Sequence, residues 1–160
     1  MTDSIFELAG QVVRRALECG VSISAAESCT GGLIGASITE IAGSSSVFFG
    51  SAVTYHNSAK ENILGIMPCV LEKYGAVSPQ CAVQMAHGAR LLYKTDYAVA
   101  VTGIAGPCGG SREKPVGTVW FGSSSTAGNF SYMCHFSGDR KAVRNATVEE
   151  ALALFLRLMK

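Results

Sequence analysis

The chain has 160 residues, of which 48% are hydrophobic and 16% charged, and its formal net charge is +1 at pH 7. The hydrophobic content excludes a mainly disordered chain, and the charged fraction lies below the ~25% of an average soluble domain. We expect a single domain over residues 1–160, because a chain of this length buries roughly two-thirds of its unfolded surface. The Lys and Arg residues form no basic tract, so we expect no nucleic-acid partner.

The sequence also lacks the patterns of membrane and secreted proteins. Its longest apolar runs, such as residues 151–156, are much shorter than the ~18 residues of a membrane span. The first residues, Met1-Thr2-Asp3-Ser4, have no basic or apolar signal region. The six cysteines contain no Cys-x-x-Cys pair and no zinc-ligand spacing. We therefore expect a cytoplasmic protein without a membrane partner or bound metal, whose cysteines are mostly buried free thiols.

Predicted helices and strands alternate along the chain. Ser4 and Glu7 have the spacing of a capping box, as do Ser58 and Glu61, and Ser78-Pro79 is a typical helix start. In chain order the patterns predict a helix ending at Gly20, a strand over 21–26, a helix over 33–42, a strand over 50–55, a helix from Ser58 to about Gly65, an irregular stretch to residue 77, a helix over 80–94, strands over 97–101, 116–123 and 129–136, and a helix from Asp139 to about Leu158.

This order predicts an α/β fold, namely a three-layer α/β/α sandwich around a mixed, mainly parallel sheet of about five strands. Three glycine-bearing turns follow strands, at residues 27–32, 102–110 and 137–140. Ligands of open α/β sheets bind where such turns meet, although each turn also has a purely conformational explanation. None of them matches a P-loop or a dinucleotide fingerprint, so the sequence gives no support to nucleotide hydrolysis or hydride transfer.

Ser28 is the candidate nucleophile. A turn from a strand into a helix presents its hydroxyl beside helix N-terminal amides that can hold an oxyanion. The alternative is that Ser28 or Thr30 only caps the helix. Cys29 is a competing nucleophile if the helix N-terminus lowers the pKa of its thiol, and otherwise it is a buried inert thiol. The three histidines lie outside these turns, so the sequence does not suggest a Ser-His-Asp triad.

Lys60 is the candidate base, because a lysine in the first turn of a helix faces the positive end of the helix dipole. A pKa near 7 requires a bias of about 4 kcal/mol against the charged amine. A helix end supplies only about 0.3–1 kcal/mol, so burial or a cationic ligand has to supply the rest. Tyr55 precedes this helix and is a candidate to relay a proton. The alternatives are a solvated surface lysine and a half-buried strand aromatic.

Arg140, Lys141 and Arg144 place three positive charges in the first turns of the last helix. Arg140 and Arg144 share one helix face, and together with the helix dipole they suit a phosphate group. The alternative is a solvated basic face.

Seven sequence blocks resemble the C-terminal domain family of the competence/damage-inducible protein CinA, which includes stand-alone nicotinamide mononucleotide deamidases. The blocks occur in the order of the family and cover nearly the whole chain. They are Ala26-Glu27-Ser28-Cys29-Thr30-Gly31-Gly32, Ile41-Ala42-Gly43-Ser44-Ser45, Val53-Thr54-Tyr55-His56-Asn57-Ser58-Ala59-Lys60, Gly75-Ala76-Val77-Ser78, Thr102-Gly103-Ile104-Ala105-Gly106-Pro107, Lys114-Pro115-Val116-Gly117-Thr118-Val119 and Ser137-Gly138-Asp139-Arg140. The sequence departs from the family pattern at Cys108, where we associate the family with a polar or acidic residue.

The resemblance implies an enzyme that hydrolyses the carboxamide of nicotinamide mononucleotide to nicotinic acid mononucleotide and ammonia. It implies Ser28 as nucleophile, Lys60 as base and Tyr55 as third catalytic residue. It also implies a small-molecule partner, a homo-oligomer such as a dimer, and no metal or redox cofactor. The substrate-binding residues that follow from the matched motifs are Glu27, Cys29, Thr30, Gly31, Gly32, Thr102, Gly103, Ile104, Ala105, Gly106 and Arg140.

Two further functions remain open at this point. One is a catalytically silent module of the same family that binds a ligand or partner in competence or the DNA damage response. The other is hydrolysis of an amide in a different cationic or phosphorylated compound. Retention of Ser28, Tyr55 and Lys60 together favours an enzyme over a silent module.

Overall fold

The computed structural model describes all 160 residues and centres on one five-stranded sheet in the order β2-β1-β3-β4-β5. β1 pairs in parallel with β2 and β3, whereas β4 pairs antiparallel with β3 and β5. The predicted mixed sheet of five strands is therefore confirmed. The strands are β1 (Ile23–Glu27), β2 (Phe48–Val53), β3 (Tyr97–Gly103), β4 (Thr118–Ser125) and β5 (Gly128–His135).

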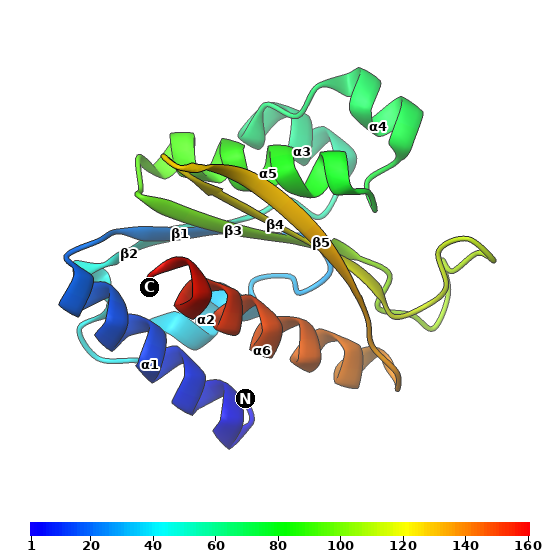
Figure 1. The fold of residues 1–160 in the computed structure, drawn as a ribbon. Helices are drawn as coiled ribbons and strands as arrows, with labels where there is room; N and C mark the ends of the chain where they lie inside the picture. Colours follow the sequence, from blue (N-terminus) through cyan, green and yellow to red (C-terminus); the bar gives the residue numbers. More distant parts are fainter.

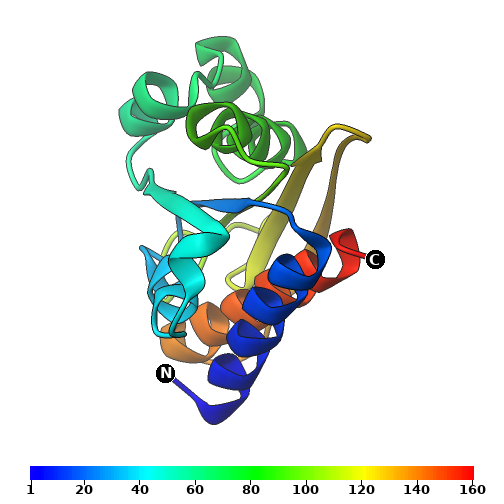
Figure 2. The ribbon, with the colours of Figure 1, turned by 90° about the vertical axis from the view of Figure 1, so that its left-hand side faces the viewer.

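Six helices cover the two faces of this sheet. They are α1 (Asp3–Cys19), α2 (Leu33–Thr39), α3 (Asn57–Leu64), α4 (Pro68–Tyr74), α5 (Pro79–Tyr93) and α6 (Arg140–Leu158), and a 3-10 turn, η1, spans Ser44–Ser46. Helices α1, α2 and α6 lie on one face and α3, α4 and α5 on the other (Figure 1). Figure 2 shows α1 and α6 side by side beneath the sheet. The predicted three-layer α/β/α sandwich is thus confirmed.

The two layers of helices pack on the sheet in different ways. The larger core cluster, 24 residues against 12, lies beneath the sheet, where α1 and α6 contribute branched apolar side chains such as Val12 and Leu152. On the other face, alanines and glycines bring backbones together. A Cβ at Gly122 of β4 would lie 2.0 Å from the Ala82 carbonyl of α5, and one at Gly88 would lie 2.2 Å from the Leu64 carbonyl of α3. These close approaches fix α3 and α5 above the sheet.

Two predicted helix caps were each wrong by two residues. The N-cap of α1 is Thr2, whose hydroxyl accepts from the Ile5 N–H, so the Ser4 capping box does not form. The N-cap of α3 is His56, whose Nδ1 accepts from the Ser58 N–H. In both cases an earlier side chain accepts the free N–H of the first turn, which extends the helix past the predicted cap. The caps predicted at Ser78 and Asp139 are confirmed.

The structure corrects two other expectations. Helix α4 occupies part of the stretch predicted to be irregular, and it begins with Pro68 at its first helical turn. Its seven residues are too few to show a helical period in the sequence. All six cysteines are free, but only Cys29 and Cys81 are buried, so the expectation of mostly buried thiols is wrong. Every helix is too short or too polar to cross a membrane.

Candidate active site

The loops that follow the three parallel strands lie at one edge of the sheet. β1, β2 and β3 are parallel and end at Glu27, Val53 and Gly103, and the loops that follow them carry most of the predicted site residues. The order of these strands, β2-β1-β3, places the loop after β1 between the other two. This central position is where ligands bind in open α/β sheets.

Ser28 directly follows β1 and is held by its backbone. Its N–H donates to the Val101 carbonyl of β3 over 3.1 Å, and its carbonyl accepts from the Gly31 N–H over 3.2 Å. The first bond continues the pairing of β1 with β3, and the second closes a four-residue turn. Ser28 is 9% exposed, so its hydroxyl retains access to solvent.

The side chain of Lys60 reaches this serine from the opposite wall of the site. Its Nζ lies 3.0 Å from the Oγ of Ser28, 2.7 Å from the Thr54 carbonyl and 3.3 Å from the Tyr55 carbonyl. Only 1% of Lys60 is exposed, which excludes the solvated surface lysine considered from the sequence. The molecule's two ion pairs involve other residues, so no carboxylate neutralises this amine.

Burial lowers the pKa of Lys60 from its ordinary value of 10.5, and the neighbouring thiols of Cys81 and Cys29 partly oppose the change. The direction agrees with the expectation for a base. The cause is desolvation of the charged amine, which costs more free energy than the dipole of a short helix supplies.

The Cys29 thiol does not have the lowered pKa of a reactive thiol. It is 6% exposed, and burial raises its pKa to about 12. Helix α2 begins four residues later, at Leu33, so its N-terminus does not lower the pKa as the competing hypothesis required. At neutral pH this side chain is a protonated thiol, which is a poor nucleophile.

Tyr55 and Arg140 meet at the mouth of the site. The Tyr55 hydroxyl accepts a hydrogen bond of 3.0 Å from one guanidinium nitrogen of Arg140, and the other nitrogen donates to the Gly106 carbonyl over 2.8 Å. Tyr55 is 62% exposed, so it is not the half-buried aromatic considered as its alternative. Its hydroxyl forms no hydrogen bond with Ser28 or Lys60; only its backbone carbonyl contacts the lysine.

These groups surround a pocket of about 190 Å³. The predicted residues brought together there are Ser28, Cys29, Tyr55, Lys60, Thr102, Gly103, Ala105 and Arg140. The predicted residues outside its lining are Glu27, Thr30, Gly31, Gly32, Ile104 and Gly106. The lining residues absent from the prediction are Asn57, Ala76 and Val77, all of which belong to sequence blocks quoted above.

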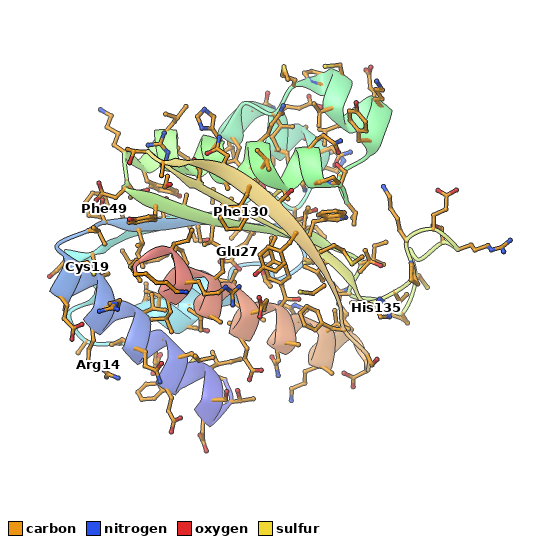
Figure 3. The ribbon with its side chains drawn as sticks, viewed as in Figure 1. Arg14, Cys19, Glu27, Phe49, Phe130 and His135 are labelled. Carbon is orange, nitrogen blue, oxygen red and sulfur yellow. The ribbon has the colours of Figure 1, made fainter.

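Glu27 organises the turn from within the protein. Its carboxylate is fully buried and accepts five hydrogen bonds of 2.7–3.1 Å, and Figure 3 shows it at the centre of the molecule. The donors are the Thr30 and Ser51 hydroxyls and the N–H groups of Gly32, Ile34 and Gly35. Glu27 and Thr30 therefore support the turn from within, and contact of either with a ligand stays a prediction.

The arginines of α6 clamp the loops around the pocket. Arg144 donates to the Thr30 carbonyl over 2.6 Å, while Arg140 holds the loop that contains Gly106. Neither guanidinium has a carboxylate partner. The site therefore carries uncompensated positive charge, although the two arginines bind different loops rather than one common point. The protein has no group of three or more His, Cys, Asp or Glu side chains arranged to hold a metal ion.

Comparison with known proteins identifies the family. The profile described as the CinA C-terminal domain matches residues 5–159 of the chain. This chain belongs to the CinA C-terminal domain family. The crystal structure of the competence/damage inducible protein CihA from Agrobacterium tumefaciens superposes with a TM-score of 0.96 at 45% identity, over 100% of this chain and 98% of that one.

Three curated relatives of this chain differ in how much of their own length it covers. The nicotinamide-nucleotide amidohydrolase PncC of Escherichia coli K12 is 47% identical over 95% of this chain and 93% of its own length. The PncC of Enterobacter agglomerans is 52% identical over 84% of this chain and 83% of its own. The CinA-like protein of Geobacter metallireducens is 50% identical over 88% of this chain, which spans only about a third of that protein, 34%.

The one departure from the CinA pattern noted in the sequence, Cys108, lies away from the pocket. Its side chain is exposed and is not part of the lining. The neighbouring Ala105 does line the pocket, so the loop after β3 contributes to the site through its first part.

Proposed function

We propose that this protein hydrolyses the carboxamide of nicotinamide mononucleotide to nicotinic acid mononucleotide and ammonia. The observation that carries the proposal is the 3.0 Å contact between the Ser28 hydroxyl and the buried, uncompensated amine of Lys60. Relatives of nearly the same length that are named nicotinamide-nucleotide amidohydrolase support the choice of substrate.

The contacts of Lys60 suit a neutral amine that acts as a base. A neutral amine has two N–H groups and one lone pair, and Lys60 has two carbonyl acceptors and one hydroxyl within 3.3 Å. If the N–H groups donate to the Thr54 and Tyr55 carbonyls, the lone pair faces the Ser28 hydroxyl. Lys60 then accepts the serine proton without rearrangement.

The reaction proceeds in two halves. Ser28 Oγ forms a bond to the amide carbon, the carbonyl electron pair moves to oxygen, and the serine proton moves to Lys60. Collapse of this intermediate breaks the C–N bond, and Lys60 returns the proton to the leaving nitrogen, which departs as ammonia. Water then attacks the acyl-serine ester and gives one proton to Lys60. The bond from the acyl carbon to the serine oxygen breaks, Lys60 returns the proton to that oxygen, and the acid product loses its own proton to solvent and leaves as the carboxylate.

The substrate's own charge assists Lys60. Its pyridinium ring withdraws electrons from the amide carbon, and a cation in the pocket disfavours a second positive charge on the lysine. In this proposal Arg140 and the loop from Thr102 to Gly106 hold the nucleotide, and the absence of a carboxylate partner at Arg140 supports its binding of a phosphate. Neutral nicotinamide lacks both features and should be a poor substrate.

Ammonia release by purified protein tests this function. We expect the wild type to deamidate nicotinamide mononucleotide much faster than nicotinamide. Ser28→Ala and Lys60→Ala should reduce turnover to near background, whereas Cys29→Ala should still turn over. Activity that survives in Ser28→Ala and disappears in Cys29→Ala would overturn the assignment of the nucleophile.

Ammonia release, measured together with ligand binding, separates the alternative functions. Binding of the mononucleotide without ammonia release would indicate a silent ligand-binding module. Tight phosphate-dependent binding without mononucleotide turnover would indicate a different amide substrate. The dimer and the cytoplasmic location implied above remain predictions, the second supported by the six free thiols, three of them exposed.

A further inference from the structure

The reaction proposed above develops a negative charge on the amide oxygen, and the site needs N–H donors for it. The sequence suggested that the first amides of α2 supply them. In the structure three N–H groups at this helix start, those of Gly32, Ile34 and Gly35, already donate to the buried carboxylate of Glu27 over 2.9–3.1 Å. Glu27 therefore occupies the end of α2 that an oxyanion would otherwise reach.

The backbone N–H of Cys29, in contrast, does not donate to Glu27. Its residue lines the pocket and follows Ser28 directly, yet this N–H has no hydrogen-bond acceptor on another residue. The N–H of Ser28 donates to Val101, and that of Gly31 donates to Ser28. The N–H of Thr30 also has no acceptor, but Thr30 does not line the pocket, so Cys29 carries the only free amide of this turn that faces it. Apart from a contact with its own thiol, this N–H has no partner, so it is available to an acceptor that enters the pocket.

We propose that the backbone N–H of Cys29 is a donor of the oxyanion hole; this inference rests on the proposed amide hydrolysis at Ser28. An N–H one residue after the nucleophile lies within reach of the oxygen of any carbonyl that the nucleophile attacks, as in other strand-to-helix turns that carry a nucleophilic serine. The Cys29 thiol takes no part. Glu27 holds the turn through the Thr30 hydroxyl and Arg144 through the Thr30 carbonyl, which keeps this N–H in place.

The test replaces the backbone N–H at position 29 with an oxygen atom and keeps the same side chain in the reference and test proteins. The reference protein is Cys29→Ala, and the test protein carries lactic acid instead of alanine at position 29, introduced by semisynthesis. The ester bond so formed has the shape of the peptide bond but no N–H. We expect kcat for nicotinamide mononucleotide to fall about 10²–10³-fold relative to Cys29→Ala, with KM nearly unchanged, because the lost bond forms mainly in the transition state.

Cys29→Pro is a second, fully genetic variant that also lacks the N–H. Position 29 is the second residue of the turn closed by the Gly31 to Ser28 hydrogen bond, and proline is favoured there. It should fold and show a similar loss of kcat. Equal kcat in the ester protein and Cys29→Ala would overturn this inference and leave the hydrolase intact. Failure of the wild type to release ammonia would instead overturn the hydrolase, and this inference with it.

Discussion

At the scale of single residues, the decisive feature is a lysine that the protein buries without a counter-charge. The sequence indicated Lys60 as a base from its place at a helix start, but its burial depends on the packing of α3 against α5. No local pattern contains that information. Its pKa is lowered because the charged form loses hydration, and this favours the neutral amine beside Ser28.

The pH dependence of the reaction follows from this lysine. A base must be neutral to accept a proton, so kcat/KM should rise with pH, by about tenfold per unit below the lowered pKa of Lys60, and level off above it. Because that pKa lies below 10.5, the plateau should begin at a lower pH than for an ordinary lysine. Rates of ammonia release from pH 5 to 10 measure the profile.

Lys60→Arg is the matched control, because a guanidinium is never deprotonated in this range. It should be inactive at every pH. A profile for the wild type that is flat, or that still rises steeply at pH 10, would contradict the assignment of Lys60 as a base with a lowered pKa.

At the scale of structural elements, the turn between β1 and α2 depends on Glu27. One carboxylate oxygen accepts from Thr30, Gly32 and Ile34, and the other from Gly35 and Ser51. The sequence placed Glu27 next to the nucleophile but did not reveal its direction. From sequence alone, a glutamate at the end of a buried strand could contact a ligand or accept hydrogen bonds within the protein. The positions of the surrounding N–H groups decide between these two roles.

Glu27→Gln tests this structural role. Glutamine has nearly the same shape but only one acceptor oxygen, so at least two of the five donors lose their partner. We expect the free energy of unfolding to fall by about 2–4 kcal/mol, since each buried unsatisfied donor costs about 1–3 kcal/mol. Urea denaturation followed by circular dichroism measures the change.

The matched control is Glu40→Gln at the C-terminal end of α2, where the side chain is exposed and forms no ion pair. It should change the free energy of unfolding by less than about 0.5 kcal/mol. Equal stability of the two variants would show that Glu27 does not hold the turn.

At the scale of the whole molecule, strand alternation and glycine turns were enough to predict the layers and the mixed sheet. That prediction depended on the continuous apolar segment that begins at Tyr97 and on the helix caps at Ser78 and Asp139. Helix α4 was missed because it is short, and two caps were misplaced because Thr2 and His56 accept earlier N–H groups. Strand order, which brings the loops after β1, β2 and β3 together, is a property of the complete fold.

Residues of the pocket differ in how easily the sequence identifies them. Ser28, Lys60 and Arg140 come from α-helical and strand ends far apart in the chain, and the motifs identified them because their residue types carry chemistry. Asn57, Ala76 and Val77 line the same pocket but are chemically ordinary, so only the fold assigns them to it.

The most direct test of the account is to trap the acyl-enzyme. The protein is mixed with nicotinamide mononucleotide, quenched in acid within one turnover, digested and analysed by mass spectrometry. We predict a nicotinic acid mononucleotide acyl group on the peptide that contains Ser28, attached through the serine oxygen and absent in Ser28→Ala. An acyl group on Cys29, or undiminished ammonia release by Ser28→Ala, would contradict the claim that Ser28 is the nucleophile.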